Sequence, residues 1–189
     1  NRQLEAGFKK GYSVISQVLD MYEADNEERI STLNLGTQSG SLKHVFQKYL
    51  KTSLVADKLA SFYGTHSIVI GNKYMFFTPE YTTLNGEKVT NLNSFDDGAI
   101  VTNDGMLIFF ENGAGWNGNR LYIHIDVNGF NKRPNRLGYD VFSFQIDQNG
   151  RLLPMGAKGT FYYDANDKYC SQNSTEAYNG IACAYKAIS

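Results

Sequence analysis

The sequence contains no long hydrophobic run and no block of charge of one sign. Its longest apolar runs, such as residues 106–110, have four or five residues, far fewer than the ~20 that cross a bilayer. Lys and Arg together number 18 against 19 Asp and Glu, so no broad positive field is available to hold a polyanion. We therefore expect no nucleic-acid partner and no membrane-spanning segment within these residues.

Residues and motifs typical of catalysis are also scarce. The chain has three histidines and lacks a G-x-S-x-G turn, an H-E-x-x-H helix and a phosphate-binding glycine loop. His124 and Asp126 lie two residues apart on one predicted strand face and could begin a metal or acid–base site. A histidine on an exposed face is the interpretation we favour. Because no nucleophile with a matched base can be assembled, we predict that the chain is not an enzyme.

Only two cysteines occur, Cys170 and Cys183, in a polar stretch near the C-terminus. They are too few for a zinc site, and no C-x-x-C motif is present. We favour a disulfide, which would indicate an oxidising compartment and would stabilise the fold by roughly 3 kcal/mol by the chain-entropy argument. Two free thiols in a cytosolic protein are the alternative.

The hydrophobic periodicity changes along the chain and predicts an α+β fold in one domain of 189 residues. Residues 1–28 are predicted to form an amphipathic helix that packs on one face of the sheet, and residues 29–92 a variable connection of helix and strand with a second helix from Ser41. Short turns predict hairpins at residues 67–78 and 99–110. A period of two then predicts an antiparallel sheet meander over residues 93–158, followed by a disulfide-closed C-terminal loop over residues 159–189. The apolar stripe of the first helix consists of Leu4, Phe8, Tyr12, Ile15 and Leu19.

A glycine-rich segment at residues 113–118 follows a predicted strand and carries the only tryptophan, Trp116. We interpret this segment as a flexible hairpin loop. Exposed among asparagines, Trp116 could stack on a sugar ring, which would make the chain a carbohydrate-binding module. A tryptophan tucked into the loop is the alternative that we favour.

The stretch at residues 125–156, IDVNGFNKRPNRLGYDVFSFQIDQNGRLLPMG, resembles the strand–loop–strand of bacterial pilin-like proteins with a prepilin-type N-terminal methylation segment. The residues that match are Asp126, Asn128, Gly129, Pro134, Asn135, Gly138, Asp140 and Phe142. Residues 95–99, FDDGA, are similar to a strand start that is usually Leu-Ala-Asp-Gly in that family, with Asp96 in place of the small residue. Residues 178–183 are similar to the family's closing cysteine region.

The resemblance implies a pilin-like fold in which residues 4–22 form the C-terminal half of a long N-terminal helix, its apolar half being absent from this sequence. In the family, that missing half anchors the subunit in the inner membrane before assembly and later packs in the filament core. We therefore expect an extracytoplasmic subunit of a type IV pilus or type II secretion filament, surrounded by copies of itself or by other subunits. The apolar stripe is expected to be its assembly face, and a secreted or surface adhesin is the alternative.

The loop between the two strands of this stretch has two interpretations. Pro134 fixes one backbone angle, glycines permit positive φ, and Asn and Asp side chains can bond nearby backbone, so the loop could simply be rigid. The other interpretation is a Ca²⁺ site formed by Asp126, Asn128 and Asp140, which begins with the Asp-x-Asn-Gly pattern of a hard-cation loop. No other cofactor is expected.

Overall fold

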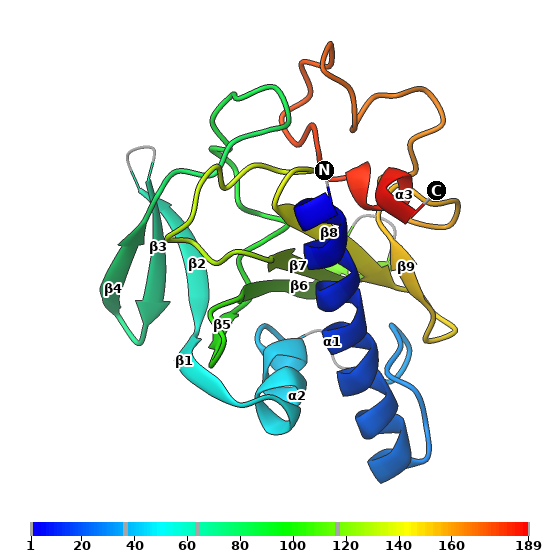
Figure 1. The fold of residues 1–189 in the computed structure, drawn as a ribbon. Helices are drawn as coiled ribbons and strands as arrows, with labels where there is room; N and C mark the ends of the chain where they lie inside the picture. The colour runs from blue at the N-terminus through cyan, green and yellow to red at the C-terminus, as the bar shows by residue number, and fades with distance from the viewer. Residues whose placement is uncertain (1, 36–37, 63–64, 116–117, 189) are drawn as a thin grey trace.

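The computed structural model of the chain describes residues 2–35, 38–62, 65–115 and 118–188, and it is an α+β fold (Figure 1). The helices are α1 (Arg2–Asn26), α2 (Ser41–Tyr49) and a short α3 (Cys183–Ile188). The strands are β1 (Thr52–Ala56), β2 (Lys58–Phe62), β3 (Thr65–Ile70), β4 (Lys73–Thr78), β5 (Ala99–Thr102), β6 (Leu107–Gly115), β7 (Gly118–Asp126), β8 (Val141–Ile146) and β9 (Leu152–Pro154).

Two antiparallel sheets organise these strands. The larger sheet has six strands in the order β1-β5-β6-β7-β8-β9, and the smaller has three in the order β2-β3-β4. Strands β5 to β9 follow one another in sequence, which confirms the predicted meander over residues 93–158. The alternating pattern of these strands places one set of side chains on each face, so the large sheet can bury both faces.

One hydrophobic core lies between α1, α2 and the large sheet, as the blue and cyan helices in front of the sheet show (Figure 1). Its sheet side is formed by Ile108 and Phe110 of β6 and by Ile123 and Ile125 of β7. A second core covers the opposite face under irregular chain segments and contains Phe109 and other large side chains. The large sheet is therefore the central layer.

Both ends of α1 are tied to the sheet layer. Helix α1 ends where Glu27 adopts a positive φ of 59°. The guanidinium of Arg29 then donates to the carboxylate of Glu23 at 2.6 Å and to the carbonyl of Gly150 at 2.9 Å, in the turn between β8 and β9. Nearer its start, Lys10 forms an ion pair with Asp104 at 2.7 Å, in the turn between β5 and β6.

Several sequence predictions are confirmed, and others were wrong. The helix from Ser41 and the hairpins at residues 67–78 and 99–110 are present. Strand β1, which falls in the predicted variable connection, pairs with β5 and extends the large sheet. Residues 113–115, predicted to be a flexible loop, continue β6 and pair with β7. Within the part of the chain that the structure describes, no helix is long and apolar enough to cross a membrane.

Candidate functional site

The packing interface between α1 and the large sheet is the first candidate site. Phe8, Ile15 and Leu19 are 2%, 0% and 3% exposed. The ring of Phe8 lies 5.2 Å from that of Phe142, edge to face, and 5.6 Å from that of Phe144. The predicted assembly stripe therefore packs in the protein's own core, because the period of 3.6 marks a buried face without saying which surface buries it.

The prediction that this stripe makes contacts between subunits is accordingly wrong for Phe8, Ile15 and Leu19, whose side chains are already covered. Tyr12 is 38% exposed at the edge of the stripe. The side chain of Leu4 lies outside the described residues. Any contact of α1 with another molecule must use its outer face.

Two glycines set the distance between α1 and the sheet. A Cβ added at Gly7 would lie 2.8 Å from Cγ2 of Val127, and one added at Gly11 would lie 3.0 Å from Cδ1 of Ile125. Real Cβ atoms essentially never lie as close as 2.8 Å to another atom and rarely as close as 3.0 Å. Larger side chains would therefore push the helix away from the end of β7. Gly7 and Gly11 thus allow close packing, a role that the helical periodicity alone does not predict.

The outer face of α1 is exposed and carries charge of both signs. Lys9 and Glu5 form an exposed ion pair at 2.9 Å, which contributes little to stability because water screens it. Toward the other end of the helix, the Asp20 side chain is 72% exposed. Basic groups thus lie in the first half of α1, and acidic groups dominate its second half.

Strand β4 presents the other conspicuous surface. It is an edge strand of the small sheet, and four consecutive large side chains on it are exposed. Tyr74, Met75, Phe76 and Phe77 are 52%, 49%, 44% and 62% exposed. Apolar side chains gathered on an edge strand are typical of contact surfaces, since the open edge can also pair with another chain.

The loop that follows β7 is held by its two buried aspartates. Asp140 accepts hydrogen bonds from the backbone N–H groups of Asn135 at 2.9 Å and Arg136 at 2.7 Å. Asp126 accepts one from the hydroxyl of Tyr81 at 2.8 Å and one from the backbone N–H of Asn128 at 3.2 Å. These bonds fit the rigid-loop interpretation.

The calcium interpretation of the same loop stays a prediction, and the geometry of the loop does not favour it. The oxygens of Asp126 and Asp140 already accept hydrogen bonds from protein donors, and the Asn128 amide nitrogen, not its oxygen, faces Asp140 at 3.4 Å. Burial, together with the nearby charge of Asp140, raises the pKa of Asp126 to about 7. Asn128, the third predicted ligand, does not turn its amide oxygen toward Asp140.

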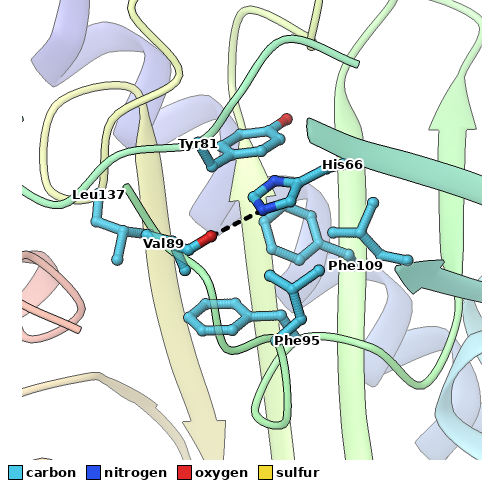
Figure 2. A pocket seen from close by; sticks show the side chains of 8 residues that line it. His66, Tyr81, Val89, Phe95, Phe109 and Leu137 are labelled. Carbon is cyan, nitrogen blue, oxygen red and sulfur yellow. Dashed lines mark hydrogen bonds between the residues drawn. The ribbon is translucent and has the colours of Figure 1, made fainter. Parts of the chain in front are cut away.

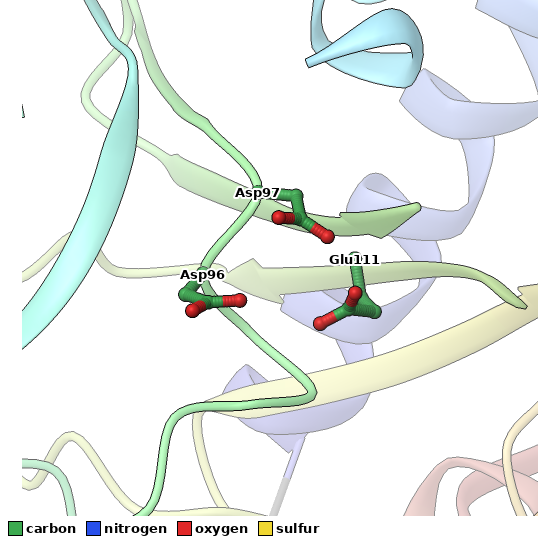
Figure 3. A group of neighbouring side chains, drawn as sticks. All are labelled: Asp96, Asp97 and Glu111. Carbon is green, nitrogen blue, oxygen red and sulfur yellow. The ribbon is translucent and has the colours of Figure 1, made fainter. Parts of the chain in front are cut away.

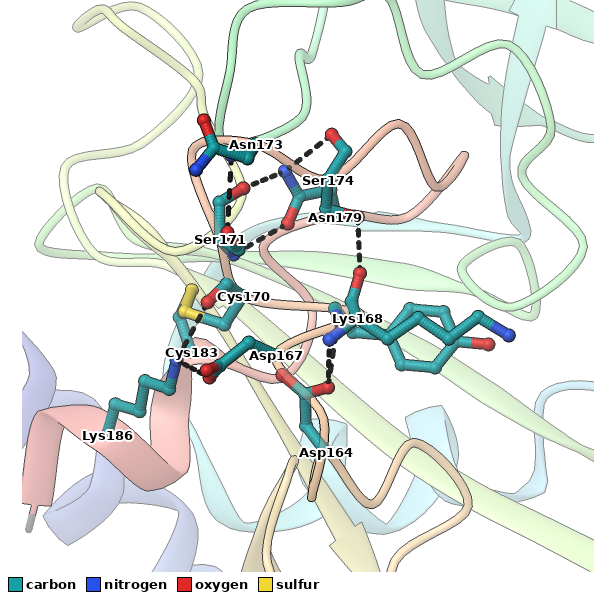
Figure 4. The surroundings of a disulfide bond; sticks show 11 residues. Asp164, Asp167, Lys168, Cys170, Ser171, Asn173, Ser174, Asn179, Cys183 and Lys186 are labelled. Carbon is teal, nitrogen blue, oxygen red and sulfur yellow. Dashed lines mark hydrogen bonds and ion pairs between the residues drawn. A yellow bond between two sulfur atoms is a disulfide. The ribbon is translucent and has the colours of Figure 1, made fainter.

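The loop and the C-terminal segment, two motifs far apart in the sequence, are packed against each other. Cys170 and Cys183 form the predicted disulfide (Figure 4). Gly138 in the loop has a φ of 81°, and a Cβ there would lie 2.6 Å from the sulfur of Cys183. A Cβ at Gly180 would lie 2.3 Å from the carbonyl oxygen of Leu137. Each glycine is therefore required by a close approach as well as by its backbone angle.

The disulfide-closed segment is ordered by a buried side-chain amide. Asn179 is fully buried, and its amide donates to the carbonyl of Ser171 at 2.6 Å while its oxygen accepts from the N–H of Ser171 at 3.1 Å (Figure 4). Lys186 of α3 donates to the carbonyl of Cys170 at 2.8 Å. The predicted C-terminal loop therefore ends in a helix that packs back on the disulfide.

The prediction that His124 lies on an exposed face was wrong, because that face of the sheet is covered by the second core. His124 is fully buried, with Nε2 2.7 Å from the carbonyl oxygen of Ser94 and Nδ1 2.7 Å from the hydroxyl of Ser143. Since the carbonyl only accepts, Nε2 carries the proton and Nδ1 accepts from Ser143. Burial lowers the pKa of His124 to about 3. The imidazole is thus neutral, and Asp126 bonds to other partners.

His66 is buried as well, in a small pocket on the same side of the sheet (Figure 2). Its Nε2 lies 3.0 Å from the carbonyl oxygen of Val89, and its ring stacks on that of Tyr81 at 5.2 Å. Burial lowers its pKa below the ordinary value. The void beside these residues is about 10 Å³, room for about one water molecule. This pocket is too small for a substrate.

One group of side chains comes together in a way that no sequence pattern predicts. Asp96, Asp97 and Glu111 bring three carboxylates together beside β6. The Asp96-Asp97 pair was noted only as part of a family resemblance, and Glu111 is 14 positions beyond Asp97 in the sequence, so no local spacing joins them. Trp116, which could stack on a sugar ring but which we expected to be tucked into its loop, lies outside the described residues.

Comparison with protein-family models, with curated proteins and with solved structures finds no match for this chain. Its function has to be inferred from its own residues and geometry.

Proposed function

We propose that this chain is a structural subunit of a bacterial surface or secretion filament, a pilin or pseudopilin, that assembles through the N-terminal helix. The observation that carries the proposal is the helix–sheet unit. A helix of 25 residues lies along an antiparallel sheet with one face in the core, two glycines allow close packing, and the outer face is left exposed. This geometry suits a subunit whose helix contacts other subunits inside a filament while its sheet lies on the filament surface.

A second copy of the same chain is the partner that these surfaces fit. On α1, Lys9 and Lys10 lie on the first half, and Asp20, Glu23 and Asp25 on the second. Copies that are staggered along a common axis would bring the acidic half of one helix beside the basic half of the next, which favours head-to-tail addition. Exposed apolar side chains on β4 would add a contact at the outer layer.

The proposed location is extracytoplasmic, with the subunit anchored in the inner membrane before assembly. The Cys170–Cys183 disulfide supports this location, because such bonds persist in oxidising compartments and are rare in the cytosol. A disulfide that closes the end of the chain also suits a subunit exposed outside the cell.

The proposed role is non-catalytic. The two histidines on the second-core side, His66 and His124, are buried and hydrogen-bonded to backbone carbonyls. The pocket beside His66 is too small to admit a substrate. We therefore assign structural roles to His66 and His124.

The gene sequence upstream of the Asn1 codon tests the proposal. A short basic leader that ends in glycine, followed by ~20 apolar residues that continue α1, is the expected result. An ordinary cleavable signal peptide directly before Asn1 would contradict it and would favour the secreted adhesin.

A further inference from the structure

Three carboxylates converge next to the large sheet (Figure 3). Asp96 and Asp97 precede β5, Glu111 lies on β6, and one oxygen from each lies within 4.8 Å of the others. The backbone fixes this arrangement, since the N–H of Asp97 donates to the carbonyl of Phe110 at 2.8 Å and the N–H of Phe110 donates to the carbonyl of Gly98 at 3.0 Å. The cluster is therefore part of the sheet framework rather than a chance meeting of surface side chains.

Glu111 distinguishes this cluster from an ordinary acidic patch. It is 4% exposed, and its Oε2 has no hydrogen-bond partner among the described residues. Figure 3 shows its carboxyl directed toward those of Asp96 and Asp97. A buried carboxylate oxygen without a partner costs about 1–3 kcal/mol or more, so such an atom calls for an explanation.

Among the residues that the structure describes, no protein cation forms an ion pair with the three carboxylates. Within the described parts of the chain, no Lys, Arg or His nitrogen lies within 4.0 Å of these carboxylate oxygens. Lys58 near Asp96 and Arg120 near Glu111 act only over a longer range. Lys43, whose stem packs on Gly98, directs its ammonium to Asp57 at 3.5 Å.

We propose that Asp96, Asp97 and Glu111 form a binding site for a hard divalent cation, with Ca²⁺ as the first candidate. Carboxylate oxygens are the ligands that Ca²⁺, Mg²⁺ and Mn²⁺ prefer, and a cation would occupy the unpartnered oxygen and offset the repulsion among three negative charges. Ca²⁺ suits the site best, because it accepts irregular geometry and keeps water ligands on an open side. Asp96 and Asp97 are only partly buried and leave such a side.

Other side chains already orient one of the ligands. The hydroxyl of Ser39 donates to one oxygen of Asp97 at 3.0 Å, and the backbone N–H of Asn112 donates to the other at 3.1 Å. Such bonds hold a ligating carboxylate in place and are a usual support for metal sites.

The three carboxyls repel one another when they are ionised. Burial and the neighbouring Asp97 raise the pKa of Glu111 to about 10, and burial raises the pKa of Asp96. A cation held among the three groups would offset this repulsion.

The test is isothermal titration calorimetry of the metal-stripped protein with CaCl₂, MgCl₂ and MnCl₂ at pH 7. We expect one site per chain and at least ~10-fold weaker Ca²⁺ binding in Glu111→Gln and Asp96→Asn. Glu28→Gln, the same change at an exposed carboxylate, should bind like the native chain.

Thermal unfolding in EDTA and in Ca²⁺ shows whether the Glu111→Gln variant loses cation binding or loses its fold. In EDTA, Glu111→Gln should melt at or above the native temperature, because the amide removes a buried ionisable group. Ca²⁺ should raise the melting temperature of the native chain and not that of the variant. Absence of heat with all three cations, or full binding retained in both Glu111→Gln and Asp96→Asn, would overturn the proposal. Absence of heat would mean that the three carboxyls are neutralised by shared protons instead of a cation. Full binding in both variants would mean that the cation binds elsewhere, such as between Asp126 and Asp140.

Discussion

Truncation of Ile15 to alanine tests whether α1 is held by the sheet as described. Ile15 lies in the middle of α1, is 0% exposed and belongs to the core between the helices and the large sheet. Removing a fully buried isoleucine side chain down to its Cβ costs about 2–5 kcal/mol. Because the site is enclosed by rigid strands that cannot collapse far, we expect about 3–4 kcal/mol, or a melting temperature lower by roughly 6–16 °C.

Met21→Ala is the matched control, since it truncates a large apolar side chain on the same helix at a position that is 39% exposed. We expect it to cost less than about 1.5 kcal/mol. Alanine is the best helix former, so neither change weakens the helix itself. Urea unfolding followed by circular dichroism gives both values from curves of equal slope. If the decreases in the free energy of unfolding caused by Ile15→Ala and Met21→Ala agree within about 0.5 kcal/mol, the packing of α1 on the sheet is refuted.

Three further predictions concern other parts of the fold. Cys170→Ser should lower the free energy of unfolding by about 3 kcal/mol and the melting temperature by several degrees, and identical melting curves with and without reductant would refute this. His124 has a folded pKa of about 3, below its unfolded value, so the stability it contributes is present above pH ~6.5 and is lost as pH falls toward 3. Between pH 6.5 and 4.5, the free energy of unfolding of the native protein should therefore fall by about 2–3 kcal/mol more than that of His124→Gln, which keeps a neutral side chain beside Ser143. Equal decreases in the two proteins would contradict this prediction. Gly7→Leu should destabilise by about 1–3 kcal/mol because the new side chain collides with Val127, and an unchanged urea midpoint would show that α1 is not close to β7.

Local patterns predicted most of the regular structure because each element was amphipathic on its own. The 3.6 period of α1 and the alternation in β7 and β8 came from sheet and helix faces that are buried in the first core. The disulfide was predictable because only two cysteines exist. Strand β1 was missed, since its partner β5 is more than 40 residues away and only that pairing makes it a strand.

The candidate sites were less predictable, because they depend on what covers the sheet. His124 alternates with apolar neighbours, a pattern that marks one face as different but does not show that an irregular segment with Ser94 buries it. The same limit applies to Glu111, which meets Asp97 only through the pairing of β5 with β6. Sequence spacing alone does not predict these long-range contacts.

The most direct test of assembly through α1 is cross-linking between copies of the full-length chain in the cells that make it. Lys9→Cys combined with Asp20→Cys places two thiols on α1 that are ~16 Å apart along one helix, so a short bis-maleimide cannot join them within a subunit. The native cysteines are held in the disulfide and do not react. We predict a ladder of dimers, trimers and longer products on denaturing gels, which each single variant fails to give. Monomer alone in the double variant, with both thiols shown to be labelled, would contradict helix-mediated assembly.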